Sequence, residues 1–233
     1  MGPGIYTINM TRGILIVGND SSLSAAVAAE AARRVEQFAF AQIPNRISGP
    51  PWEKPALGAE HRIPLSWNPG SPISARTLVL SAENRLERID EAVLVCSPPS
   101  IRRPAGELIP TEIEIMVNDH IKGWFFLVKE LAALFKAKKG GILALVLSEI
   151  SSGSAKDETI DLLGPSAAAS FRAFAQNLLS SSQREPYQTM AFTASEAGEE
   201  TAFASFIFKI LEEGNKRNNG KLHKFGRLSF FGR

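Results

Sequence analysis

The chain has 233 residues and a mass of 25.3 kDa, and hydrophobic residues make up 44% of it, which allows a full core and argues against global disorder. Its single cysteine, Cys96, excludes an internal disulfide framework and a multi-cysteine metal site. No apolar run approaches the ~20 residues that a membrane span needs, and the first twelve residues lack the pattern of a secretory signal. These features predict a cytoplasmic protein with no membrane segment and no metal site.

The formal net charge of +2 conceals a basic C-terminal tail at residues 215–233. This tail contains no acidic residue, and its basic residues are Lys216, Arg217, Lys221, Lys224, Arg227 and Arg233. A basic tail can bind nucleic acid. This one is short and interrupted by apolar residues, so we expect a solvated or packed terminus and no nucleic acid partner.

Apolar strand patterns alternate with helical patterns along the whole chain. In chain order, the predicted elements are a strand at 13–18, a helix at 22–36, strands at 37–43 and 61–67, a helix at 68–89, a strand at 90–99, a helix at 110–141, a strand at 142–150, a helix at 164–182, a strand at 187–195, a helix at 199–214 and a short strand within 221–231. This alternation predicts a doubly wound parallel α/β sheet in a single domain spanning residues 1–233, with a long loop at 44–60.

Local signals mark several of these boundaries. Pro64 lacks a backbone N–H and places the third strand near an edge of the sheet. Ser71 and Pro72 are typical of the N-cap and first position of a helix. Thr111 and Glu114 have the spacing of a capping box, which predicts the start of the longest helix.

Within that longest helix, apolar residues recur at helical spacing. They are Trp124, Leu127, Val128, Leu131 and Phe135. We expect this stripe to pack in the core rather than to contact a ligand, and we expect Cys96 to be a small core residue as well.

Four stretches together resemble the short-chain dehydrogenase/reductase family over nearly the whole chain. They are the strand–turn–helix at 13–34, "EAVLVCSPP" at 91–99, the segment from "NDHIKGWFF" to the strand "GGILALVLS" within 118–153, and "GPSAAASFRAFAQNLL" at 164–179. The resemblance implies a Rossmann-type fold, an NAD(P) cofactor and oxidoreductase chemistry. It also implies a homodimer or homotetramer, because the helices that match 110–141 and 164–182 form the dimer interface in the family.

The turn after the first strand departs from the family's cofactor motif. The family has a G-x-x-x-G-x-G pattern there, and its glycine positions fall on Gly18, Ser22 and Ser24 of this chain. Glycine is needed because the backbone must approach the pyrophosphate closely. The two serine side chains and the negative charge of Asp20 predict that NAD(P) binds weakly at Gly18, Ser22 and Ser24, or does not bind.

The residues at the family's catalytic positions differ even more from the family's pattern. In the family a tyrosine supplies the proton for carbonyl reduction and a lysine lowers its pKa, and the two positions fall here on Gly164 and Ala168, which can do neither. The family's serine matches Ser148 when counted from the preceding glycine pair, or Ser151 when counted back from Gly164. The helix asparagine is replaced by His120.

Two functions follow from these departures and stay open at this point. The first is a catalytically degenerate relative of the family that acts as a binding or scaffold protein. The alternative is an active NAD(P)-dependent oxidoreductase with a shifted proton donor, for which His120 and Ser148 are the candidates. Arg46, after the second strand, is a residue that could favour a 2′-phosphate. Neither the ligand nor the substrate follows from the sequence.

Overall fold

The computed structural model describes residues 12–44, 46, 61–147, 161–194 and 198–226. Within these ranges, seven parallel strands form one sheet in the order β3-β2-β1-β4-β5-β6-β7. The strands are β1 (Ile14–Asn19), β2 (Phe38–Ile43), β3 (Arg62–Leu65), β4 (Glu91–Cys96), β5 (Ile142–Leu147), β6 (Gln188–Ala194) and β7 (Lys221–Phe225). The prediction of a doubly wound parallel α/β sheet is therefore confirmed.

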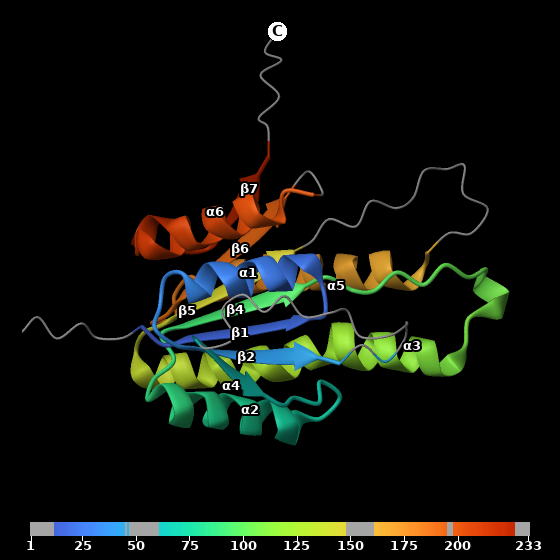
Figure 1. The fold of residues 1–233 in the computed structure, drawn as a ribbon, viewed down its shortest axis with the longest axis horizontal. Coiled ribbons are helices and arrows are strands. Elements are labelled where there is room, and N and C mark those ends of the chain that lie inside the picture. The colour runs from blue at the N-terminus through green and yellow to red at the C-terminus, as the bar shows by residue number, and fades with distance from the viewer. Residues whose placement is uncertain (1–11, 45, 47–60, 148–160, 195–197, 227–233) are drawn as a thin grey trace, which may run out of the picture.

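Helices cover both faces of this sheet. Figure 1 shows α1 (Ser22–Ala32) and α6 (Glu200–Glu212) on one side of the strands, and α2 (Pro72–Leu86) and α4 (Gly123–Lys138) on the other. The fifth of these covering helices, α5 (Leu163–Ser181), packs its buried side chains into the same core as α2 and α4. The strands between the two edges of the sheet, β2, β1, β4, β5 and β6, are therefore buried on both faces, which explains their nearly continuous apolar sequences.

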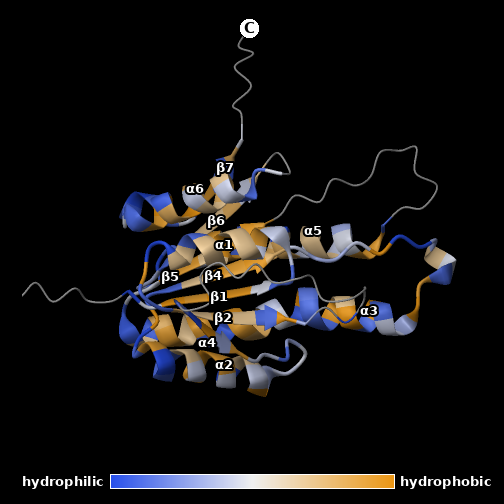
Figure 2. Ribbon diagram, in the orientation of Figure 1, coloured by the Kyte–Doolittle hydropathy of each residue, from blue (hydrophilic) through white to orange (hydrophobic). Residues whose placement is uncertain are grey.

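The core consists of one apolar layer on each side of the sheet. The layer under α2, α4 and α5 contains the buried stripe of α4, including Trp124 and Phe135, as predicted. The layer under α1 and α6 contains Val27, Phe203 and Phe208. Figure 2 shows β1 and β4, between these layers, as largely hydrophobic. Cys96 is buried beside Trp124, and its burial raises the pKa of the thiol, so it behaves as a core residue.

Several predicted boundaries agree with the structure. β3 lies at one edge of the sheet and contains Pro64. Ser71 is the N-cap of α2, and its hydroxyl accepts a hydrogen bond from the amide of Ser74 at 3.2 Å. The short strand expected near the C-terminus is β7, which pairs with β6 in parallel. Residues Lys221–Phe225 of the basic tail therefore form an edge strand of the sheet.

The longest predicted helix differs from its prediction in two ways. Its first segment, α3 (Pro110–Val117), has Ile109 at the N-cap and no side-chain cap, so the predicted Thr111–Glu114 capping box is wrong. Proline at the first helical position begins the helix instead, because its fixed φ already suits a helix. A π-helical turn at Asn118–Lys122 then separates α3 from α4.

The remaining short elements are 3₁₀ turns at Ala105–Glu107 and Lys216–Asn218. No helix in the described part of the chain has the length and apolar character to cross a membrane.

Candidate functional site

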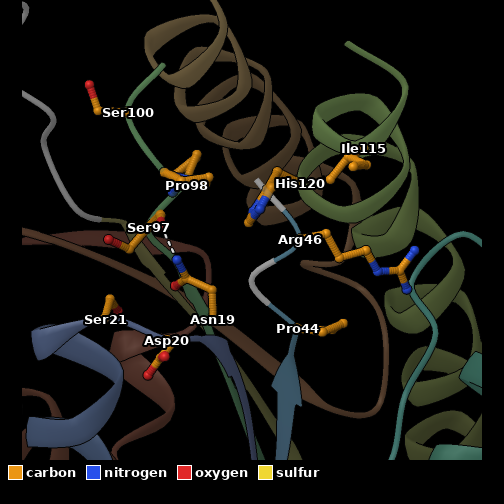
Figure 3. A pocket seen from close by; sticks show the side chains of 11 residues that line it. Asn19, Asp20, Ser21, Pro44, Arg46, Ser97, Pro98, Ser100, Ile115 and His120 are labelled. Carbon is orange, nitrogen blue, oxygen red and sulfur yellow. Dashed lines mark hydrogen bonds between the residues drawn. The ribbon is translucent and has the colours of Figure 1, made fainter. Parts of the chain in front are cut away.

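A cavity of about 260 Å³ lies at the carboxyl ends of β1, β2 and β4. The chain passes from β1 to β2 on one side and later returns to β4 on the other side of β1, so the strand order reverses here. Ligands of open α/β sheets bind at such a reversal. The cavity is lined by Asn19, Asp20, Ser21, Pro44, Arg46, Ser97, Pro98, Pro99, Ser100, Ile115 and His120 (Figure 3).

Asn19, the last residue of β1, connects β1 to the segment after β4 beside this cavity. Its side-chain amide donates a hydrogen bond to the carbonyl oxygen of Ser97, the first residue after β4 (Figure 3). Because this bond uses the Nδ2 group, the Oδ1 atom of Asn19 is left facing no hydrogen-bond partner among the described residues. Asn19 is only 9% exposed, so this oxygen is a buried acceptor beside the cavity.

One amide in the first turn of α1 is satisfied by a serine side chain of the chain itself. Ser21 is the N-cap, and its hydroxyl accepts a hydrogen bond from the amide of Ser24 at 3.2 Å and lies 3.0 Å from the Ser24 hydroxyl oxygen. Ser24 is buried beneath Gly18, where an added Cβ would lie 2.5 Å from the Ser24 Oγ. The Ser22 hydroxyl lies 3.2 Å from a carboxylate oxygen of Glu200 on α6. Of this turn, Asn19, Asp20 and Ser21 line the cavity, and Gly18, Ser22 and Ser24 do not.

The residues of this turn fit a pyrophosphate poorly. One amide of the α1 N-terminus already donates to Ser21, and Asp20 places a carboxylate at the cavity. A phosphate there would compete with the Ser21 cap and would lie beside a like charge.

The π-helical turn directs His120 into the cavity from the opposite side. Figure 3 shows the imidazole ring pointing into the pocket between Pro98 and Arg46. His120 is 4% exposed, and burial lowers the pKa of its ring to about 4. The ring is therefore neutral at pH 7, and its Nδ1 atom has no hydrogen-bond partner in the described part of the chain. π-Helical turns occur often at functional sites.

The neighbouring Asp119 is completely buried, at 0% exposure. Its Oδ2 atom lies 3.7 Å from the Nε atom of Arg46, which forms an ion pair but is too long for a hydrogen bond. Neither carboxylate oxygen has a hydrogen-bond partner among the residues described. Burial raises the pKa of Asp119, and the charge of Arg46 opposes that rise.

Gly164, which the sequence predicts to match the family's tyrosine, packs closely against Pro99 and Asp161. A Cβ atom added to Gly164 would lie 2.8 Å from the carbonyl oxygen of Pro99 and 2.7 Å from the Oδ2 atom of Asp161. Asp161 is held in this place because its Oδ1 accepts a hydrogen bond from the Gly164 amide at 3.0 Å. Ala168, which the sequence predicts to match the family's lysine, follows one turn later in α5. A side chain at residue 164 would therefore crowd Pro99 and Asp161.

Two residues singled out in the sequence, Ser148 and Ser151, lie outside the described residues. Among the residues that are described, no group of three or more His, Cys, Asp or Glu side chains could hold a metal ion. His61 and His223 belong to other parts of the fold: the first lies beside the carbonyl oxygen of Glu36 and the second stacks on Phe192.

Sequence reasoning missed the roles of Asn19, Ser97 and the Arg46–Asp119 pair. Asn19 and Ser97 stand at the carboxyl ends of two strands, which is the position where ligand-binding residues of this kind of sheet are found. Their position at the end of a strand is the signal in the sequence that could have identified Asn19 and Ser97. The ion pair joins residues far apart in the sequence and has no local signal.

Comparison with known proteins identifies the fold that carries this cavity. No family model matches the sequence, and no curated protein matches it. Among solved structures, levodione reductase superposes with a TM-score of 0.71 at 13% identity, over 92% of this chain and 95% of that one. A short chain dehydrogenase from Mycobacterium smegmatis gives a TM-score of 0.72 at 13% identity, over 94% of each chain.

A short-chain type dehydrogenase/reductase from Mycobacterium marinum is equally similar, with a TM-score of 0.72 at 13% identity, over 92% of this chain and 93% of that one. The resemblance in the sequence motifs and the similarity of the structures agree. The chain has the fold of the short-chain dehydrogenases and reductases.

Proposed function

We propose that this chain binds a small ligand in the cavity at the β1–β4 reversal and does not transfer hydride. The observation that carries this proposal is the packing of Gly164, whose missing Cβ would lie 2.8 Å from the Pro99 carbonyl oxygen. This position, where the family has its tyrosine by the sequence match, is a glycine in this chain. The close packing of Gly164 leaves little space for any larger side chain there. The proton donor of carbonyl reduction is thus missing from the helix that would carry it.

The turn between β1 and α1, where the family binds its cofactor, supports the same proposal. Ser21 caps α1, and Asp20 adds a negative charge where a pyrophosphate would lie. Each lost contact to a cofactor costs on the order of 1 kcal/mol or more. Several such losses move a micromolar site toward a millimolar one. We therefore propose weak or absent binding of NAD(H) and NADP(H).

The alternative is an oxidoreductase that uses His120 as a shifted proton donor. Its position in the cavity favours this role. Its low pKa opposes it, because a ring with a pKa of about 4 carries almost no proton to donate at pH 7. Ser148, the other candidate donor, remains a prediction from the sequence.

We further propose that the chain forms a homodimer, or a homotetramer built from such dimers, through α4 and α5. Phe125 on α4 is 50% exposed and its ring lies 4.4 Å, between centroids, from that of Phe174 on α5. Ile113 and Val117 on α3 extend the exposed apolar surface along the same helical path. A second copy would bury this surface, since exposed apolar patches mark interaction sites. A cytoplasmic location remains part of the proposal.

A hydride-transfer assay with a panel of carbonyl compounds and alcohols, in the presence of NADH, NADPH and their oxidised forms, tests the functional proposal. We expect no turnover above that of a blank. Turnover that is abolished in His120→Ala and retained in His223→Ala would support the alternative. His223 is the control because it stacks on Phe192 and does not line the cavity.

A further inference from the structure

We propose that a second cavity, between α5 and the edge strand β7, binds small carboxylates that carry a short aliphatic chain. This cavity has a volume of about 150 Å³, and residues of β5, α5, β6 and β7 line it. Among the described residues, it shares no lining residue with the cavity at the β1–β4 reversal. Binding here therefore does not depend on the function proposed for the first cavity.

The alternation of side chains along β7 directs two of them into this cavity. His223 stacks on Phe192, which belongs to the core layer under α1 and α6. Successive side chains of a strand point to opposite faces of the sheet. Leu222 and Lys224, on either side of His223, therefore project from the face that carries α5, and both line the cavity.

The residues that α5 contributes lie on one side of that helix. They recur at three- and four-residue spacing, and they are Arg172, Ala175, Gln176 and Leu179. Phe174 instead packs against Phe125 of α4, in the surface proposed for the dimer. The cavity and this phenylalanine pair thus occupy different sides of α5.

Apolar side chains form much of the cavity wall. Ala191 of β6 and its register partner Leu222 of β7 both line it. Leu147 of β5 and two α5 residues, Ala175 and Leu179, complete the apolar surface. Because an apolar cavity of this volume can hold benzene, there is room here for a chain of about five or six carbon atoms.

The charged residues that line the described cavity are both basic. Arg172 comes from α5 and Lys224 from β7, and both side chains are exposed, so a ligand in solution can reach them. None of the ion pairs between described residues involves Lys224. Gln176, one turn after Arg172, adds an amide group that can donate. These donors suit a carboxylate, which only accepts hydrogen bonds while it is ionised.

Titration of the isotope-labelled full chain with hexanoate, followed by the NMR shifts of its backbone amides, tests the proposal and locates the site. We expect the largest shifts at β6, β7 and α5 around the cavity. Hexanoate should bind about threefold or more tightly than hexanamide, which has the same chain and no charge. It should bind about tenfold or more tightly than acetate, which lacks most of the chain.

Lys224→Gln should weaken hexanoate binding about threefold, because an exposed charge contributes modestly to an ion pair. Lys221→Gln is the matched control, since it removes the same charge from the same strand but from the opposite face, and it should leave the affinity unchanged.

The proposal is overturned if hexanoate does not bind, if hexanamide binds as tightly, or if the two substitutions have equal effects. Shifts confined to the cavity at the β1–β4 reversal would overturn it as well. These outcomes are separate from the functional proposal, which fails only if the chain transfers hydride or binds NAD(P) tightly.

Discussion

The backbone of Gly164 lies directly against the carbonyl oxygen of Pro99, so that even a methyl group at residue 164 would lie 2.8 Å from that oxygen. Pro99 follows β4 and Gly164 belongs to the first turn of α5. This contact joins two segments that both border the cavity end of the sheet. It limits the size of the side chain that residue 164 can carry.

The first prediction concerns Gly164→Ala. The added methyl group would crowd Pro99 and Asp161, and overpacking of this kind typically costs about 1–3 kcal/mol, which the better helix propensity of alanine offsets in part. We expect the free energy of unfolding in urea to fall by about 1–2 kcal/mol. Gly140→Ala is the matched control, since nothing lies within 4 Å of the Cβ position at Gly140. Equal stabilities for the two variants would refute the crowding at Gly164.

The second prediction concerns the turn after β1. A methyl group in Gly18→Ala would lie 2.5 Å from Ser24 Oγ and 3.2 Å from Val95 Cβ. We expect a loss of about 1–3 kcal/mol of folding stability. In a Ser24→Ala background the oxygen is gone, so the same substitution should cost at least about 1 kcal/mol less. A double-mutant cycle measured by urea unfolding gives this coupling, and a coupling of zero would show that Ser24 does not fill the space.

The third prediction concerns the pH dependence of stability. Burial lowers the pKa of His120 from 6.5 to about 4, so the unfolded chain binds the proton more readily than the folded chain. The stability that neutral His120 contributes is therefore complete above pH 6.5 and is lost as the pH falls toward 4. The difference corresponds to about 3 kcal/mol.

Urea unfolding of the natural chain and of His120→Gln at several pH values between 7 and 4 measures this effect. Asp119, whose pKa burial raises, is common to both chains and does not enter the comparison. The natural chain should lose about 3 kcal/mol more than the variant over this range. Parallel stability curves would contradict a buried, neutral His120.

The fourth prediction concerns assembly. Phe125→Glu places a charge in the exposed apolar surface of α4, where Phe125 contacts Phe174. Light scattering at micromolar concentration should show a dimer or tetramer for the natural chain and a monomer for this variant. Ile73→Glu is the control, because Ile73 is 77% exposed but lies on α2. A natural chain that is already monomeric would overturn the proposed assembly.

Much of the fold was predictable because its signals are local. The apolar run of β1, the edge position that Pro64 gives to β3 and the N-cap at Ser71 each depend on neighbouring residues. The π-helical turn at Asn118–Lys122 was not predictable in this way. Its residues fit a regular helix equally well, and the extra residue in the turn depends on what the helix packs against.

The site was predictable only in part. The sequence indicated Gly18, His120 and Gly164 as positions of interest, and the structure places all three near the carboxyl ends of the strands. The hydrogen bond from Asn19 to Ser97 joins residues 78 positions apart, and it exists because β1 and β4 are neighbours in the sheet. Contacts of this kind follow from strand order and register rather than from any local pattern.

Calorimetric titration of the chain with NADH and with NADPH tests the central claim most directly, because the claim is that the fold is kept without its usual cofactor chemistry. The Ser21 cap and the charge of Asp20 both oppose a pyrophosphate at the α1 N-terminus. We expect a dissociation constant in the millimolar range or no measurable heat. A dissociation constant in the low micromolar range for either nucleotide would contradict this account and make an active oxidoreductase the better one.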